Sequence, residues 1–197
     1  SITFGSGATN ANLTSNYSAS DYPTIVSYNN TTITIDPSGN WNFSKLNINV
    51  SGNADTLRAI TSTSSNNNYT LKDITFWVNI TNAANDDVIL LGTTSNISLD
   101  RVNITVENVT DIITGGGTPG TYIINNSNIS GFFRGTVFTG GTIPATIENT
   151  LINMTGVSTA DGLMSASGAG PDIIKNSTII VPDRVAEISN DTNITDS

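Results

Sequence analysis

The stretch that decides the fold is Leu71-Lys-Asp-Ile-Thr-Phe-Trp-Val78. Its first position is apolar and its second and third are polar. From Ile74 onward, apolar side chains recur at every second residue, as they must in a β-strand with one buried face. The polar pair Lys72 and Asp73 interrupts this alternation. The octapeptide therefore predicts a bend that leads into a half-buried strand.

The same pattern recurs along the chain, with copies that begin 23 to 28 residues apart. The other copies are Phe43-Ser-Lys-Leu-Asn-Ile-Asn-Val50, Leu99-Asp-Arg-Val-Asn-Ile-Thr-Val106, Ile124-Asn-Asn-Ser-Asn-Ile-Ser-Gly131, Ile147-Glu-Asn-Thr-Leu-Ile-Asn-Met154 and Ile174-Lys-Asn-Ser-Thr-Ile-Ile-Val181. Between or after copies lie second apolar patches, at residues 57–60, 88–91, 112–113, 137–138, 163–164 and 185–188. No copy has the apolar spacing of a helix. Short strands at this period predict a solenoid of stacked coils.

Aligning the copies predicts how the coils stack. Equivalent residues in a parallel stack lie about 4.8 Å apart. The third position forms the column Lys45, Asp73, Arg101, Asn126, Asn149 and Asn176. The second position forms the column Ser44, Lys72, Asp100, Asn125, Glu148 and Lys175. Opposite charges then meet on neighbouring coils, and the three asparagines predict an amide ladder.

These features resemble those of right-handed parallel β-helix proteins, which include pectate-lyase-like enzymes, viral tailspikes and surface adhesins. A β-sandwich is the alternative, but it gives no reason for the charge match between copies. We expect an all-β, single-domain parallel β-helix of about six coils. Residues 1–40 would form an N-terminal arm and cap strands, residues 41–189 the helix, and residues 190–197 a polar tail. One buried stack should contain Leu46, Ile48, Ile74, Phe76, Val102, Ile104, Ile129, Ile152 and Ile179.

The composition restricts the chemistry. The chain of 197 residues has no Cys and no His, and its net charge is −9 with only seven Lys and Arg. Disulfides and thiolate metal sites are therefore excluded, as is a histidine base. So few basic residues also argue against nucleic acid as a partner. No run approaches the roughly 20 apolar residues of a membrane-spanning helix, and no cofactor is expected.

Asn-x-Ser/Thr sequons are far more frequent than chance predicts. The chain has 17, where random order would give roughly seven. They are Asn12, Asn16, Asn29, Asn30, Asn42, Asn49, Asn68, Asn79, Asn96, Asn103, Asn108, Asn125, Asn128, Asn153, Asn176, Asn190 and Asn193. The alternative explanation is that strands favour Thr while turns favour Asn and Ser. We expect glycans on at least a third of the sequons, favouring Asn68, Asn108 and Asn190, and hence an exported, extracellular protein.

Two groups of residues are candidates for catalysis or metal binding. Asp86 and Asp87 lie in an Asn/Asp-rich segment that predicts a turn, and they could hold Ca²⁺ through oxygen ligands. Asp73 and Asp100 form the second group. Parallel β-helix enzymes are similar to one another in using such acids on the outside of one sheet. Here turn formation and cationic neighbours explain the acids better than catalysis does, so we expect no catalytic site.

Aromatic residues offer a further candidate surface. Trp77, Phe132 and Phe133 could form a stacking platform for sugars. Alternation points Trp77 outwards, where it could lie at an interface or pack locally.

The chain ends suggest how copies assemble. Ser1-Ile-Thr-Phe-Gly5 alternates strictly and precedes a Gly/Ser/Asn/Thr-rich stretch. Its Ile2 and Phe4 could be donated to a neighbouring copy, or the segment could cap its own first coil. We therefore expect a structural subunit of an extracellular filament, sheath or surface layer, whose partners are copies of itself and covalent N-glycans. It resembles the Thr/Asn-rich glycoproteins that archaea export. The alternative is a carbohydrate-active enzyme or a glycan-binding adhesin.

Overall fold

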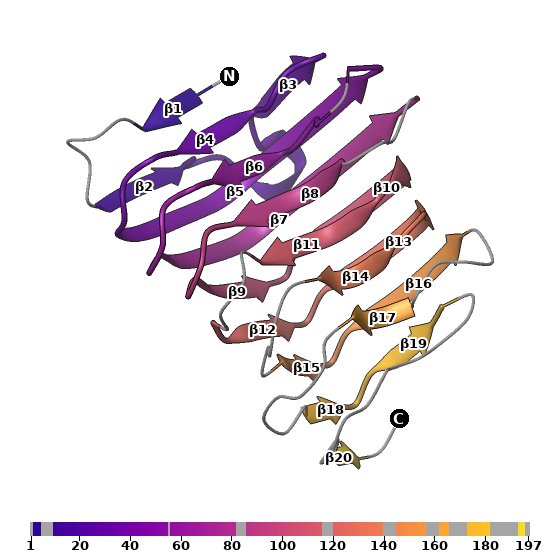
Figure 1. Ribbon diagram of the computed structural model, residues 1–197. Coiled ribbons are helices and arrows are strands. Elements are labelled where there is room, and N and C mark those ends of the chain that lie inside the picture. The colour runs from indigo at the N-terminus through magenta and orange to yellow at the C-terminus, as the bar shows by residue number, and fades with distance from the viewer. Residues whose placement is uncertain are drawn as a thin grey trace.

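The chain winds into stacked parallel strands with one short 3-10 helix, η1, at Ala19–Asp21 (Figure 1). The computed structural model describes residues 2–4, 10–54, 56–81, 86–115, 120–139, 145–156, 162–165, 173–181 and 193–195. All strand pairs in these residues are parallel. The predicted parallel solenoid is therefore confirmed. The expected number of coils, about six, is close to the seven strands of the smaller sheet.

The smaller sheet collects the second apolar patch of each repeat. In spatial order its strands are β1 (Ile2–Phe4), β4 (Ile33–Ile35), β6 (Ile60–Ser62), β8 (Asp87–Leu91), β11 (Asp111–Gly115), β14 (Thr136–Thr139) and β17 (Gly162–Ser165). One inward column of this sheet runs through Ile33, Ile60, Ile89, Ile113 and Phe138, all fully or almost fully buried. The predicted patch at residues 185–188 lies outside the described residues.

The larger sheet has thirteen strands and is bent, so that each coil contributes two legs to it. The first leg contains β2 (Asn10–Thr14), β9 (Asn96–Asp100), β12 (Tyr122–Asn125), β15 (Ala145–Glu148), β18 (Ile173–Lys175) and β20 (Asn193–Thr195). The second contains β3 (Thr24–Tyr28), β10 (Asn103–Val109), β13 (Asn128–Phe133), β16 (Leu151–Gly156) and β19 (Thr178–Ile180). Two long strands, β5 (Asn40–Gly52) and β7 (Asn68–Ile80), run through both legs.

The bend between the legs falls on the third position of every copy of the repeat. There the backbone is left-handed, with φ between 48° and 57° at Lys45, Asp73, Arg101, Asn126, Asn149 and Asn176. Asn and Asp tolerate this conformation, whereas other non-glycine residues carry a cost of roughly 1–2 kcal/mol. The predicted bend is confirmed, and its geometry accounts for asparagine at three of the six positions.

The core forms as the alternation requires. Every member of the predicted stack is buried except Ile179, which is partly buried and packs against the core. Each coil adds its inward side chains directly against those of the coils on either side. The larger sheet thus continues the stack through Ile48, Phe76, Ile104, Ile129 and Ile152.

Parallel strand pairing continues into residues 1–40, where an N-terminal arm and cap strands are expected. The strands β2 and β3 both pair with β5, and β4 pairs with β6. At the other end, β20 lies within the expected tail and pairs with β18. Residues 5–9 of the expected arm lie outside the described residues. An added strand buries core that an open coil would expose, which explains why these segments pair.

The N-terminal strand lies against its own chain. Ile2 and Phe4 of β1 are in register with Ile33 and Ile35 of β4. The ring of Phe4 lies 5.3 Å from that of Trp41 and 6.1 Å from that of Phe43, measured between centroids. Within one chain, β1 therefore lies against β4 as a self-capping strand would. Ser1 and Gly5 of the predicted segment lie outside the described residues.

Candidate functional site

The column of charges at the bend confirms the predicted register. Arg101 donates from Nε to Asp73 Oδ1 at 2.6 Å and from Nη2 to Asp73 Oδ2 at 3.0 Å. Its Nη1 donates to Asp100 Oδ2 at 2.7 Å, and Lys72 Nζ lies 4.0 Å from the same oxygen. The hydrogen bond from Arg101 lowers the pKa of Asp73 below its ordinary value. These acids therefore act as structural partners of cations, as the sequence suggested.

The amide ladder at the bend runs diagonally rather than straight down the column. Asn176 donates to Asn149 at 3.4 Å, as predicted. Asn149, however, donates to Asn125 at 3.2 Å, and Asn126 donates to Asp100 at 3.1 Å. Asn149 and Asn126 thus donate to the second position of the preceding coil, whereas Asn176 stays within the third-position column. The predicted hydrogen bond between Asn149 and Asn126 is therefore wrong, because Asn149 donates to Asn125 instead.

A straight asparagine ladder, which sequence reasoning missed, lies at the start of the first leg. Asn96 donates to Asn68 at 2.7 Å, Asn68 to Asn40 at 2.9 Å, and Asn40 to Asn10 at 2.9 Å. The backbone N–H of Thr121 donates to Asn96 Oδ1 and extends the ladder by one coil. The signal was present in the sequence, since residues 40, 68 and 96 are separated by the 28-residue period.

Asp86 and Asp87 are buried and hold the smaller sheet together. Asp86 Oδ1 accepts the backbone N–H of Leu57 at 2.5 Å. Asp87 Oδ2 accepts a hydrogen bond from Arg58 Nε at 3.1 Å, and Asp87 Oδ1 accepts one from the hydroxyl of Thr114 at 2.9 Å. Burial raises the pKa of the Asp87 carboxyl above its ordinary value. Asp87 begins β8, and residues 82–85 of the expected turn lie outside the described residues. Among the described residues, no cluster of three or more acids could hold a metal ion.

One further acid, Asp111, was not anticipated from the sequence. It lies opposite Asp87 on the next coil, and its Oδ1 accepts both the backbone N–H of Thr136 at 2.6 Å and its hydroxyl at 3.1 Å. The pair of neighbouring carboxylates is therefore surrounded by donors from the same sheet. This arrangement serves folding, because each carboxylate fixes the backbone or a side chain of an adjacent coil.

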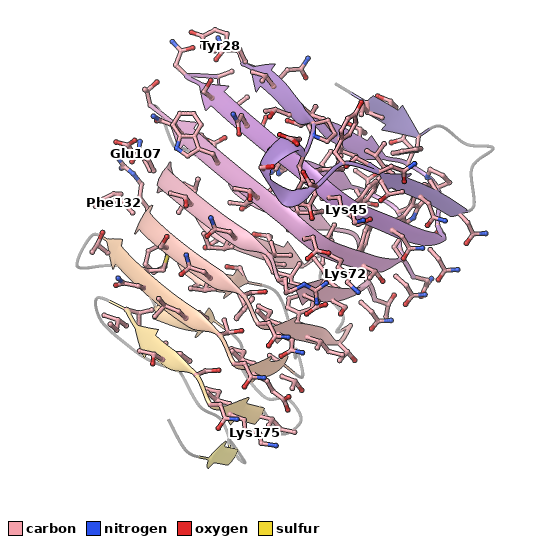
Figure 2. All side chains as sticks on the ribbon, turned by 180° about the vertical axis from the view of Figure 1, so that it is seen from behind. Tyr28, Lys45, Lys72, Glu107, Phe132 and Lys175 are labelled. Atoms are coloured by element: carbon pink, nitrogen blue, oxygen red, sulfur yellow. The ribbon has the colours of Figure 1, made fainter. Side chains whose placement is uncertain are left out.

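The outer surface of the second leg is the most distinctive exposed region, and we call it the amide face. It carries the outward side chains of β3, β10, β13, β16 and β19 together with residues 46–52 of β5 and 74–80 of β7. Its outward side chains form three columns, which begin at Thr24, Val26 and Tyr28 of β3 and continue across the neighbouring strands. Most of these residues are Asn, Ser and Thr, and only Glu107 is charged among those that the structure describes. Figure 2 shows Tyr28, Glu107 and Phe132 along one margin of this face.

Three aromatic side chains, those of Tyr28, Trp77 and Phe132, lie among the polar residues of the amide face. Tyr28 is 69% exposed and Trp77 is 41% exposed, so the predicted outward direction of Trp77 is confirmed. Phe132 is partly buried on the same face, four strand spacings, or about 19 Å, from Tyr28 in one column. The prediction that Phe133 is the third member of the aromatic platform is wrong. Phe133 is fully buried, because strand alternation points it away from Phe132 into the core.

The sequons avoid both the core and the smaller sheet. None of the described sequon asparagines is buried, and none of the seven strands of the smaller sheet contains an asparagine. Glycans attached at the described strand sequons would therefore project from the two legs of the larger sheet.

The sequons differ in whether Nδ2, the atom that receives the sugar, already donates a hydrogen bond. It does so at Asn68, Asn96, Asn108, Asn128 and Asn176. It donates to no described residue at Asn12, Asn16, Asn29, Asn30, Asn42, Asn49, Asn79, Asn103, Asn125 and Asn153. Two of the sites expected to be favoured, Asn68 and Asn108, thus have engaged amides, while Asn190 and the side chain of Asn193 lie outside the described residues.

A scan against protein-family models finds none that matches the chain, and searches of curated proteins and of solved structures find no significant match. No helix in the described parts of the chain is long and apolar enough to cross a membrane. Inference about function therefore depends on the geometry of the solenoid and its surfaces.

Proposed function

We propose that this chain is a structural subunit of an extracellular filament, sheath or surface layer, assembled by strand pairing between copies and coated with N-glycans. The observation that carries the proposal is the open edge at the N-terminal end. Among the described residues, β1 pairs only with β4, and β2 and β3 pair only with β5. In the part of the chain that the structure describes, β3 has no strand partner on the side away from β5, and we infer that this side accepts another parallel strand.

The hydrogen bonds of β3 identify which backbone groups face outwards. The N–H of Asn47 donates to the carbonyl of Pro23, and the N–H of Asn29 donates to the carbonyl of Ser51, both at 2.9 Å. Because the N–H and C=O of one residue in a parallel ladder point to the same side, odd-numbered residues of β3 face β5. The N–H and C=O of Val26 therefore face away from the solenoid, toward the position of an added strand.

Pairing between unlike ends builds a polymer. At the C-terminal end of the larger sheet, β19 pairs with β16 and β20 with β18, and neither has a second described partner. A contact between the N-terminal edge of one copy and the C-terminal edge of another does not close on itself, so it generates a filament. Main-chain hydrogen bonds supply the affinity of such strand addition.

The uneven distribution of sequons supports the glycan coat. Sugars on the two legs of the larger sheet would cover two sides of the filament with bulky, hydrated chains. The smaller sheet, without asparagine in its strands, would remain bare along the filament. Its outward column contains Thr34, Thr61, Leu90, Thr114 and Thr139, and this surface would be free for lateral contacts in a sheath or layer.

A single substitution tests the assembly. Val26→Pro removes an outward N–H at an edge strand, where proline is tolerated, and leaves the bonds to β5 in place. We expect electron micrographs and sedimentation to show polymers for the wild type and for the control Val26→Thr. The Val26→Pro variant should remain folded by circular dichroism but monomeric. A wild-type protein that stays monomeric at all concentrations would refute assembly, and a Val26→Pro variant that polymerises normally would refute pairing through β3.

A further inference from the structure

A hollow with a volume of about 190 Å³ lies at the margin of the amide face, near its N-terminal end. It is lined by Tyr28, Ser51, Gly52, Asn53, Asn79 and Thr81. Tyr28, Ser51 and Asn79 are in register on three successive coils, with the small Ser51 between the two larger side chains. Tyr28 and Asn79 are thus separated by two strand spacings, or about 9.6 Å, across a low floor.

The floor of the hollow is fixed by the turn below it. Gly52 has φ of 150°, and a Cβ added there would lie 2.0 Å from Asn29 Oδ1. That same oxygen accepts the backbone N–H of Asn53 at 2.7 Å and that of Ala54 at 3.3 Å. A side chain at residue 52 would therefore collide with the amide that holds the turn. Residue 52 must therefore be a glycine at this point of the lining.

The lining groups suit one sugar ring attached to the protein. Pockets for drug-sized ligands have volumes of roughly 300–1,000 Å³, so this hollow holds a smaller group. The ring of Tyr28 is largely exposed, and its negative face attracts the weakly positive C–H bonds of a pyranose. Asn79 and Thr81 are the first and third residues of a sequon. The Asn79 amide makes no hydrogen bond to any described residue, so Nδ2 is available for attachment.

We propose that Asn79 carries an N-linked glycan whose first sugar occupies this hollow, against the ring of Tyr28. The inference rests on the proposed glycan coat and assigns one of its sites. A transferase would supply the sugar from a phosphate-linked glycosyl donor. The bond between the anomeric carbon and the phosphate oxygen breaks, Nδ2 bonds to that carbon and loses one proton, and the phosphorylated carrier leaves. The sugar, bonded to Asn79, then packs against the ring of Tyr28 two coils away.

Six proteins from one glycosylating host test the proposal: wild type, Tyr28→Ala, Asn79→Gln, the double variant of these two, Tyr28→Phe and the control Tyr17→Ala. Glycopeptide mass spectrometry should find Asn79 modified in the first two. The Asn79→Gln substitution should lower the Tm in the wild-type background and leave it unchanged in the Tyr28→Ala background. In NMR spectra, ring protons of the first sugar should be shifted upfield by Tyr28, and this shift should persist in Tyr28→Phe and disappear in Tyr28→Ala. Tyr17→Ala, at an equally exposed tyrosine that does not line the hollow, is the control.

Each outcome separates this proposal from the broader one. If other sequons are occupied and Asn79 is not, the assigned site is wrong while the glycan coat stands. If Asn79 is modified but neither the Tm effect nor the proton shifts of its sugar depend on Tyr28, the placement of the first sugar in the hollow is wrong. If native material has the bare mass of 20.6 kDa, with no sequon occupied, the glycan coat itself fails. Coupling in Tm between Tyr28 and Asn79, together with the upfield shift, would establish the site.

Discussion

Replacing Ile104 with Ala should be among the most damaging single changes to this solenoid. The side chain is fully buried and is stacked between Phe76 on one coil and Ile129 on the next. The change removes three carbons, which costs about 2.4 kcal/mol at about 0.8 kcal/mol each. A residual cavity of ~50 Å³ at 24 cal/mol per Å³ adds about 1.2 kcal/mol. Because both neighbours are held by the backbone ladders, the gap closes poorly, and we expect a loss of about 3.6 kcal/mol.

Urea unfolding followed by circular dichroism measures this loss. The matched control is Thr105→Ala, which alters the next residue on the outer face and should change stability by no more than about 0.5 kcal/mol. The m-value must be compared as well, because coils of a solenoid can unfold separately and a changed slope would mark that behaviour. A loss below 1 kcal/mol for Ile104→Ala with an unchanged slope would refute the inward assignment of the column.

Three further predictions concern the bend, the pH dependence and the sugars. Lys45→Asn should raise the free energy of unfolding by up to about 1 kcal/mol in urea titrations, because Asn tolerates the left-handed backbone; a destabilised variant would contradict this account of the bend. The pKa of Asp73 is lowered in the folded state, so its bond to Arg101 stabilises above the ordinary pKa of 3.8 and is lost as pH falls. Asp73→Asn should therefore cost about 0.2–1 kcal/mol at pH 7 and progressively less as the pH falls below 3.8, and a loss that does not change with pH would be inconsistent with the pair. Glycopeptide mapping should find sugars more often where Nδ2 donates no bond than at the five engaged sites; higher occupancy at Asn68 and Asn108 would reverse that ranking.

The sequence by itself determined the architecture, its register and most of its core. A solenoid repeats one unit, so the period of 23 to 28 residues contains both the strand pattern and the partner of each residue on the next coil. That is why the ion pair of Asp73 with Arg101 and the burial of Ile104 could be predicted without coordinates.

Only the tertiary structure decided where the repeat stops and how the polar side chains connect. The strand β1 lies on its own β4, because covering Trp41 and Phe43 outweighs leaving the segment free. At the bend, the amides of Asn149 and Asn126 donate to second-position residues of the preceding coil, a choice of partner that the repeat alone does not specify. Asp87 becomes buried because Arg58 and Thr114 come from the preceding and following coils. The hollow between Tyr28 and Asn79 likewise exists only when three coils are stacked, and no local pattern encodes it.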